Sequence, residues 1–395
     1  MRIRSLAATV LGLGACSASG TAPVTGTQSL QVDVVSPTDP GSQTSRLADS
    51  ALTTTIDITA LDANGNVDTS FNNDLQVYEH YLGTLSPYIT APPLQTVHMS
   101  AGVATNQTIT LPLAFGPTEI WLDDGQDTKP TFATGTTTTL WYRDPFIRDI
   151  QKPRDETALS ALVASPLQNK NVAINSTRNG ATGKLVVTSV FAQGYTLADV
   201  NCPSGAAPCT AGDYDTIEVF SFSAAKDNEG NLVHEGEVID GFAGGISEFD
   251  GLTEVGFPQT FASATPVVDP SLEPPPAILD ASWFTNIILF ERNESGALQI
   301  NGATVCPLDA DYTTYKQWKL SLDGNCSNSK TLVNIISAGV TQLDPTNCVG
   351  KILPRVTGML RPVNIGSFNV WIIYPRSPAD FQLPSGDALC TLPSG

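Results

Sequence analysis

The chain has 395 residues, seven cysteines and three histidines, with 20 Lys and Arg against 39 Asp and Glu. At roughly 100–200 residues per domain, this length accommodates two to four domains, each with its own core. A formal net charge of −19 disfavours a binder of duplex nucleic acid, which needs clustered basic side chains to displace phosphate counterions. Three histidines leave little room for His-based zinc or triad chemistry.

The N-terminus has the parts of a bacterial export signal. Arg2 and Arg4 are basic, and the apolar stretch that follows is too short to span a bilayer as a helix. It ends in Leu-Gly-Ala-Cys16, which resembles the lipobox of bacterial lipoproteins. The resemblance implies a signal peptide at 1–15, lipidation of Cys16 and anchoring to the cell envelope, with Ser17 favouring the outer membrane. The alternative is an ordinary secretory signal with an incidental cysteine.

The other six cysteines are an even number, as expected of disulfides in an oxidising compartment. Cys202 and Cys209 bracket a short loop and are predicted to pair. The remaining four allow three pairings, of which Cys306–Cys326 with Cys348–Cys390 is preferred. No spacing matches the paired CxxC knuckles of a four-cysteine zinc site, so we expect disulfides, no metal and no cofactor.

Residues 16–28 are small and polar, which predicts a flexible tether. From 29 to 140, short β-rich runs are separated by turn residues, and residues 55–58 alternate between polar and apolar. The spacing fits a sandwich of seven strands. Segments 60–66, 99–104 and 116–120 resemble bacterial Ig-like domains of the invasin type, which implies a spacer or an adhesive module.

An acidic loop in this region has two interpretations. Asp62 to Asp68 carries oxygen ligands at alternate positions, as a calcium site does, but lacks the glycine at position six and glutamate at twelve of an EF-hand. Asn64-Gly65 is also a hairpin-turn signal. We predict turns here and at 227–231.

The rest of the chain predicts two further β units. Residues 141–170 carry charges of both signs and are interpreted as a linker. Residues 171–265 combine strand-like runs with glycines that indicate the bends of a small barrel. The proline-rich stretch 266–276 predicts a stiff linker, after which 277–395 repeats the strand pattern loosely.

Segments 194–199, 237–241, 247–254 and 356–380 resemble the OB-fold modules beside secreted nucleases of the endonuclease/exonuclease/phosphatase class. The resemblance implies two tandem OB-like barrels related by a distant duplication. The catalytic domain of those nucleases is expected to be absent. The predicted fold class is therefore all-β, with an Ig-like sandwich followed by two OB-like barrels.

OB barrels often bind single strands by stacking bases on aromatic side chains. Tyr195, Phe220 and Phe222 of the first barrel, with Lys351 and Arg355 of the second, form the candidate binding face. The net charges of 16–139, 140–265 and 266–395 are −10, −8 and −3, so nucleic acid is disfavoured as a partner. Three nearby carboxylates are interpreted as a solvated face: Glu248, Asp250 and Glu254.

The leading hypothesis is a lipid-anchored envelope protein, not an enzyme, that acts as a binding or assembly module with an envelope protein as partner. One alternative is an accessory module of a nuclease system that binds nucleic acid or a phosphorylated ligand. Another is an adhesin or carbohydrate-binding surface protein.

Overall fold

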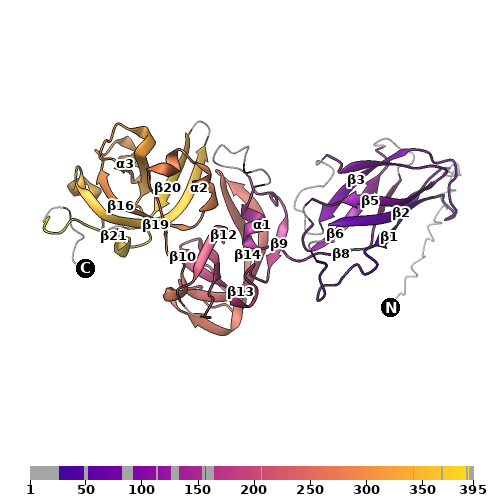
Figure 1. The fold of residues 1–395 in the computed structure, drawn as a ribbon, viewed down its shortest axis with the longest axis horizontal. Helices are drawn as coiled ribbons and strands as arrows, with labels where there is room; N and C mark the ends of the chain where they lie inside the picture. Colours follow the sequence, from indigo (N-terminus) through magenta and orange to yellow (C-terminus); the bar gives the residue numbers. More distant parts are fainter. Residues whose placement is uncertain are drawn as a thin grey trace, which may run out of the picture.

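The computed structural model describes residues 26–48, 52–81, 92–112, 114–125, 133–153, 156, 164–205, 207–340, 342–365, 368–387 and 390. Strands dominate these residues, and the helices are short, which confirms the predicted all-β fold class. Figure 1 shows three β units in a row, in the order in which the chain forms them. The predicted signal peptide, Cys16 and most of the tether lie outside the described residues.

Two facing sheets form the first unit, a sandwich. One has the order β1-β2-β5, and the other has the order β4-β3-β6-β7 with β8 paired to β6. Alternate residues of β2 are buried, including Ile56 and Ile58, so the period-two pattern of the sequence marks the face that packs on the other sheet. The strands are β1 (Ser29–Ser36), β2 (Thr53–Leu61), β3 (Asp74–Tyr81), β4 (Gln95–His98), β5 (Val103–Thr110), β6 (Pro117–Asp123), β7 (Thr134–Thr136) and β8 (Leu140–Trp141).

The second unit is a closed barrel. Its ring runs β10-β11-β12-β14-β13 and closes by the pairing of β13 with β10, while β9 adds to the outside of β13. The long β13–β14 hairpin changes register near Gly241 and Gly244. A Cβ on Gly244 would lie 2.7 Å from the carbonyl oxygen of Gly256, so only glycine fits this bend. The strands are β9 (Asn171–Ile174), β10 (Gly183–Phe191), β11 (Gly194–Asn201), β12 (Thr210–Phe220), β13 (Glu237–Phe249) and β14 (Leu252–Val268).

The third unit is a second closed barrel with the same topology. Its ring runs β16-β17-β18-β20-β19 and closes by the pairing of β19 with β16. In each ring, the strands that come third and fifth along the chain pair in parallel. These pairs are β12 with β14 and β18 with β20. Its elements are β15 (Ala277–Ile278), α2 (Ile288–Arg292), β16 (Ala297–Val305), α3 (Ala310–Tyr315), β17 (Gln317–Ser321), β18 (Leu332–Ile336), β19 (Ile352–Ile365), β20 (Phe368–Tyr374) and β21 (Phe381–Gln382).

Both segments interpreted as linkers contribute to the first barrel. Helix α1 (Ile147–Gln151) lies within 141–170, yet Ile147 and Ile150 are fully buried in the barrel core. In the proline-rich stretch, Leu272 packs against the disulfide that joins Cys202 to Cys209. The apolar residues of these two stretches pack into the core, although most of their sequence neighbours are polar. The average composition of each stretch therefore did not indicate that it contributes to the core.

Disulfides join the six cysteines expected to pair. The pairs are Cys202–Cys209, Cys306–Cys326 and Cys348–Cys390, as the preferred pairing predicts. Within the described residues, no helix has the length and apolar character needed to cross a membrane.

Candidate binding surface

Three phenylalanine rings gather at one end of the first barrel. The ring centroids of Phe220 and Phe222 lie 4.6 Å apart, and those of Phe222 and Phe257 lie 5.2 Å apart. Phe222 is 59% exposed and Phe257 is 82% exposed, while Phe220 is half-buried beneath them. We call these three residues the phenylalanine cluster. A contiguous apolar patch on a soluble protein marks an interaction site more often than scattered apolar residues do.

Two residues of the cluster have an energetically unfavourable backbone conformation. Phe222 has φ 60° and Phe257 has φ 51°, in the left-handed region that side chains with a Cβ avoid by about 1–2 kcal/mol each. Phe257 follows the register shift where Gly245 pairs with Gly256. Such backbone conformations persist where the surrounding structure enforces them, and they concentrate at functional sites.

Glycines make room for the rings at the base of the cluster. Phe220 pairs with Gly194 on β11 and with Gly256 on β14. A Cβ on Gly194 would lie 3.1 Å from the Cζ atom of Phe191, so the Phe191 ring also covers this glycine. Phe191 therefore extends the aromatic surface from the cluster towards the second barrel.

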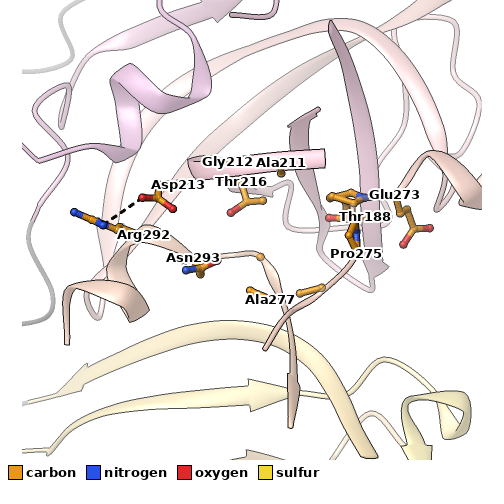
Figure 2. A pocket seen from close by; sticks show the side chains of 13 residues that line it. Thr188, Ala211, Gly212, Asp213, Thr216, Glu273, Pro275, Ala277, Arg292 and Asn293 are labelled. Atoms are coloured by element: carbon orange, nitrogen blue, oxygen red, sulfur yellow. Dashed lines mark ion pairs between the residues drawn. The ribbon is translucent and has the colours of Figure 1, made fainter. Parts of the chain in front are cut away.

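The seam between the two barrels is built from arginines of the second barrel and carboxylates of the first. Arg361 Nη2 lies 3.1 Å from Glu218 Oε1, and Figure 2 shows Arg292 turned towards Asp213. The hydroxyl of Thr216 also donates across the seam, 2.6 Å from the backbone oxygen of Glu294. Further ion pairs of these arginines are Arg292–Asp213 (3.4 Å), Arg292–Glu156 (3.4 Å), Arg376–Glu235 (2.8 Å) and, in the segment between the two rings, Arg376–Glu273 (3.3 Å).

Three cavities lie in or beside this seam. The cavity of Figure 2 has a volume of about 300 Å³ and lies between β12 and the segment before β16. A second cavity, of about 390 Å³, is lined by Phe191, Glu218 and Arg361 among others. A third, of about 380 Å³, lies on the second barrel and shares Ile336 and Tyr374 with the second. The second and third cavities thus adjoin at these two residues.

Two buried carboxyls at the seam have raised pKa values. Burial raises the pKa of Glu218 to about 7, against the opposing attraction of Arg361, and neighbouring Glu254 raises it further. Burial, with the charge of Glu235, likewise raises the pKa of Glu273 to about 7. These two carboxyls therefore exchange protons near neutral pH.

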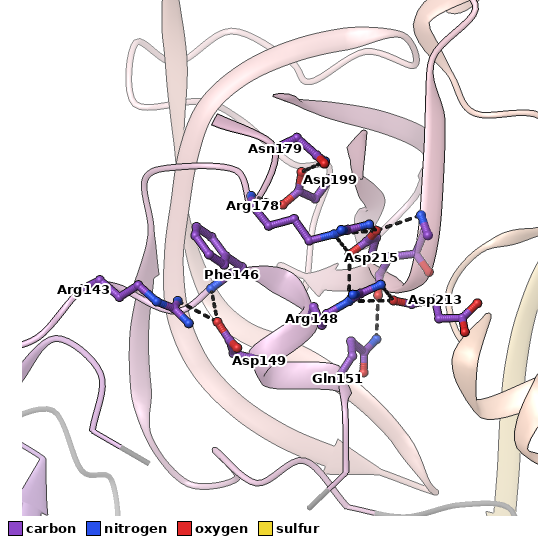
Figure 3. Close-up of polar contacts among 12 residues, drawn as sticks. Arg143, Phe146, Arg148, Asp149, Gln151, Arg178, Asn179, Asp199, Asp213 and Asp215 are labelled. Carbon is purple, nitrogen blue, oxygen red and sulfur yellow. Dashed lines mark hydrogen bonds and ion pairs between the residues drawn. The ribbon is translucent and has the colours of Figure 1, made fainter. Parts of the chain in front are cut away.

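A second polar cluster lies on the first barrel and has a structural role. Fully buried Asp215 accepts hydrogen bonds from Arg178 and from the backbone N–H of Gly212, and Arg148 Nε lies 3.5 Å away (Figure 3). Arg148 also donates to the backbone oxygen of Asp213, and this bond ties α1 to β12. Because these groups satisfy one another, the cluster stabilises the barrel and α1.

The structure separates the five residues of the predicted binding face. Phe220 and Phe222 belong to the phenylalanine cluster, but Tyr195 is fully buried, with its hydroxyl 2.7 Å from Thr260 Oγ1, so its assignment to the face is wrong. It lies on a core-facing position of β11, and the barrel interior needs a large side chain there. Lys351 and Arg355 lie on the second barrel and line none of the three cavities.

Four basic side chains of the second barrel are engaged within the chain. Lys351 Nζ lies 3.0 Å from Asp387, and Lys319 Nζ lies 2.5 Å from Asp309. Arg361 contacts Glu218 as described, and Arg355 donates to the backbone oxygen of Ala379 at 3.4 Å. These side chains do not form a free cationic groove.

The structure contradicts the predicted solvated face at Glu248 and Glu254 and confirms the predicted turn at Asp62. Glu254 is 8% exposed and Glu248 accepts hydrogen bonds from the backbone of Ser165 and the hydroxyl of Thr253, so these carboxylates do not form a solvated face. The predicted turn at Asp62 is confirmed, because its carboxylate accepts from the backbone of Asn64 and Asn66. The described residues contain no group of three or more His, Cys, Asp or Glu placed to hold a metal ion.

Several residues of the surface were missed from the sequence: Phe191, Glu218, Phe257 and Arg361. The one available signal was Gly256-Phe257-Pro258, because glycine and proline within a strand pattern indicate a bulge. Nothing in the sequence brought the other three together, since they meet only where two barrels pack.

The fold and surface define the class of protein: an all-β chain in which a sandwich precedes two closed barrels, with an exposed aromatic surface on the first barrel. No protein-family model matches the chain, and no curated protein or solved structure is significantly similar to it.

Proposed function

We propose that this protein is a non-catalytic binding protein of the bacterial cell envelope. In this proposal a lipid on Cys16 anchors it, an Ig-like sandwich serves as a spacer, and a fused pair of OB-like barrels carries the binding surface. The strand order of each ring, with one parallel pair between the third and fifth strands, supports the OB-like assignment. The two facing sheets of the first unit support the Ig-like assignment.

One observation carries the proposal. Phe222 and Phe257 are exposed, contact one another and are held outward by left-handed backbone. Exposed aromatic rings fixed in advance lose little conformational entropy on binding, which favours their use as contact residues. A protein selected for solubility alone would carry polar residues at these two positions.

The rival function, an accessory nucleic-acid module, is less well supported. Binding to single strands combines aromatic stacking with a basic groove. The seam next to the phenylalanine cluster instead contains the buried carboxyls of Glu218 and Glu254, and Arg361 is already paired. Retention on immobilised oligo-dT at low ionic strength, with a steep loss as salt rises, would support the rival.

The test is co-sedimentation of the purified protein with isolated envelopes of the source bacterium. The chain carries Cys16→Ser, so that lipid insertion cannot produce binding by itself. We expect sedimentation that is lost in the double variant Phe222→Ser/Phe257→Ser. The matched control is Val267→Ser/Val268→Ser, which alters two exposed apolar residues outside the cluster and should sediment normally. Absence of sedimentation, or equal sedimentation of all three proteins, would contradict the proposal.

A further inference from the structure

The aromatic surface continues beyond the phenylalanine cluster onto the second barrel. Phe191 covers Gly194 beside Phe220 and also lines the second cavity. Tyr374 lines both the second and third cavities, and Tyr315, which is 63% exposed, lines the far side of the third. We call this series the aromatic track; its members are Phe257, Phe222, Phe220, Phe191, Tyr374 and Tyr315.

Charge along the track excludes a polyanion as its ligand. Both arginines that line the second cavity are already paired: Arg361 with Glu218, and Arg376 with Asp380. In the third cavity, Asp311 lies 3.6 Å from Lys319. With no free cation on the lining and a net charge of −19 on the chain, a phosphate or uronate polymer would be repelled.

Strand pairing beneath the track disfavours a peptide that adds as a strand. β12 lies between β11 and β14, and β20 lies between β18 and β19, so the backbone of both strands is already hydrogen-bonded on each side. Strand addition needs an unpaired sheet edge. Recognition on the track must therefore use ring faces and side-chain hydrogen bonds, such as those that the hydroxyls of Tyr374 and Tyr315 offer at the cavities that these residues line.

We propose that the aromatic track binds a neutral, linear polysaccharide that lies across both barrels. This inference rests on the proposed function and names the class of ligand for the same surface. The apolar faces of sugar rings stack on the exposed rings of Phe222, Phe257 and Tyr315, and sugar hydroxyls bond to the polar lining of the second cavity. Because the rings lie on two barrels that ion pairs and hydrogen bonds join, the ligand is a chain rather than a single sugar.

Affinity gel electrophoresis of the Cys16→Ser full-length protein tests the inference. The neutral probes are hydroxyethylcellulose, laminarin and dextran, and the anionic probes are polygalacturonate and oligo-dT. We expect at least one neutral glucan to retard the protein, and retardation to persist in about 0.5 M salt, since no ion pairs with the ligand are involved.

Variants at both ends of the track test its extent. Phe222→Ala/Phe257→Ala and Tyr315→Ala should each weaken binding of the retarding glucan about tenfold or more, as loss of a stacked ring does. The control Ile352→Ala removes an exposed apolar side chain from the second barrel outside the track, and should stay within about twofold.

Each remaining outcome overturns the inference. These outcomes are retardation by no neutral glucan, retardation only by an anionic probe, and full binding by Tyr315→Ala, which would confine the ligand to one barrel. If the envelopes sediment the protein and the phenylalanine cluster is needed, but no glucan retards it, the proposed function stands and this inference fails. If envelope sedimentation also fails, both are wrong.

Discussion

Buried carboxylates at the barrel seam show how strongly a residue depends on its surroundings. Glu218 on β12 lies opposite Glu254 on the parallel strand β14 in the sheet register. Both side chains are nearly inaccessible to solvent. In the sequence they are ordinary acidic residues of strand-like segments. Burial raises the pKa of both carboxyls against the opposing attraction of Arg361, and this places proton binding at the seam.

The variant Glu218→Gln should reduce the pH dependence of stability. The folded-state pKa of about 7 is above the ordinary glutamate value of 4.5. The stabilising contribution of Glu218 is therefore fully present below pH 4.5 and is lost as pH rises through 7. Between about pH 6 and pH 8, the free energy of unfolding of the wild type should fall by roughly 1 kcal/mol more than that of the variant. Urea unfolding at the two pH values measures this difference.

The control is Glu229→Gln, which alters an exposed carboxylate on the same barrel and should keep the wild-type dependence. A wild type whose stability rises from pH 6 to pH 8, or a Glu218→Gln variant with the full wild-type slope, would show that the carboxyl is not buried as described.

Tyr195 offers a second test at the scale of one residue. Tyr195→Phe removes a hydroxyl that lies 2.7 Å from Thr260 Oγ1 in the barrel core, and should cost about 1 kcal/mol of unfolding free energy. Because the ring is fully buried, envelope and glucan binding should not change. If Tyr195→Phe weakens binding and leaves stability unchanged, Tyr195 is a binding residue after all.

Elements follow the sequence closely where a local pattern defines them. The alternating run at 55–58 lies in β2, and the glycine-rich stretch that predicts bends lies in the β13–β14 hairpin. A short run of apolar residues within a polar stretch of sequence is harder to assign to an element. Helix α1 is five residues long, and its burial depends on β12, which follows it by about sixty residues in the chain.

The glycine bend can be tested directly. In Gly244→Ala, the new Cβ would lie 2.5 Å from Val255 Cγ1 and 2.7 Å from the Gly256 carbonyl oxygen, so we expect a loss of about 1–3 kcal/mol. Gly339→Ala is the control, because a Cβ there meets no atom within 4 Å. Equal thermal midpoints for the two variants would mean that the bend does not need glycine.

At the scale of the whole molecule, the two barrels form one body. Arg376 donates to Asp380 on its own barrel, to the backbone oxygen of Thr188 and to Glu235 on the first barrel, and to Glu273 in the segment between the rings. The sandwich contacts the first barrel through fewer ionic groups, among them Lys170, whose Nζ lies 4.0 Å from Glu79 Oε1. The sandwich is therefore expected to unfold independently of the barrels.

Calorimetry tests this division. The wild type should show one transition for the sandwich and one for both barrels together. Arg376→Ala leaves seam carboxylates without their partner and should destabilise the barrel pair by roughly 1–3 kcal/mol, separating the barrel transition into two. Lys351→Ala, which removes an exposed pair with Asp387, should leave the profile unchanged. If the wild type already shows separate transitions for the two barrels, the barrels do not unfold as one unit.

The sequence by itself determined the all-β class, most strand positions, the turn at Asp62 and the Cys202–Cys209 pair, because alternation, turn residues and close cysteine spacing are local signals. It left three pairings open for the other four cysteines, with a preference for the pairs that the structure contains. It also placed Phe220 and Phe222 on the surface of interest, but assigned Tyr195 to it wrongly. Only the tertiary structure decided which outer faces of the barrel strands are covered, since that depends on how the two barrels pack against each other. The seam, the raised pKa of Glu218 and the track from Phe257 to Tyr315 all arise from this packing of residues distant in the chain.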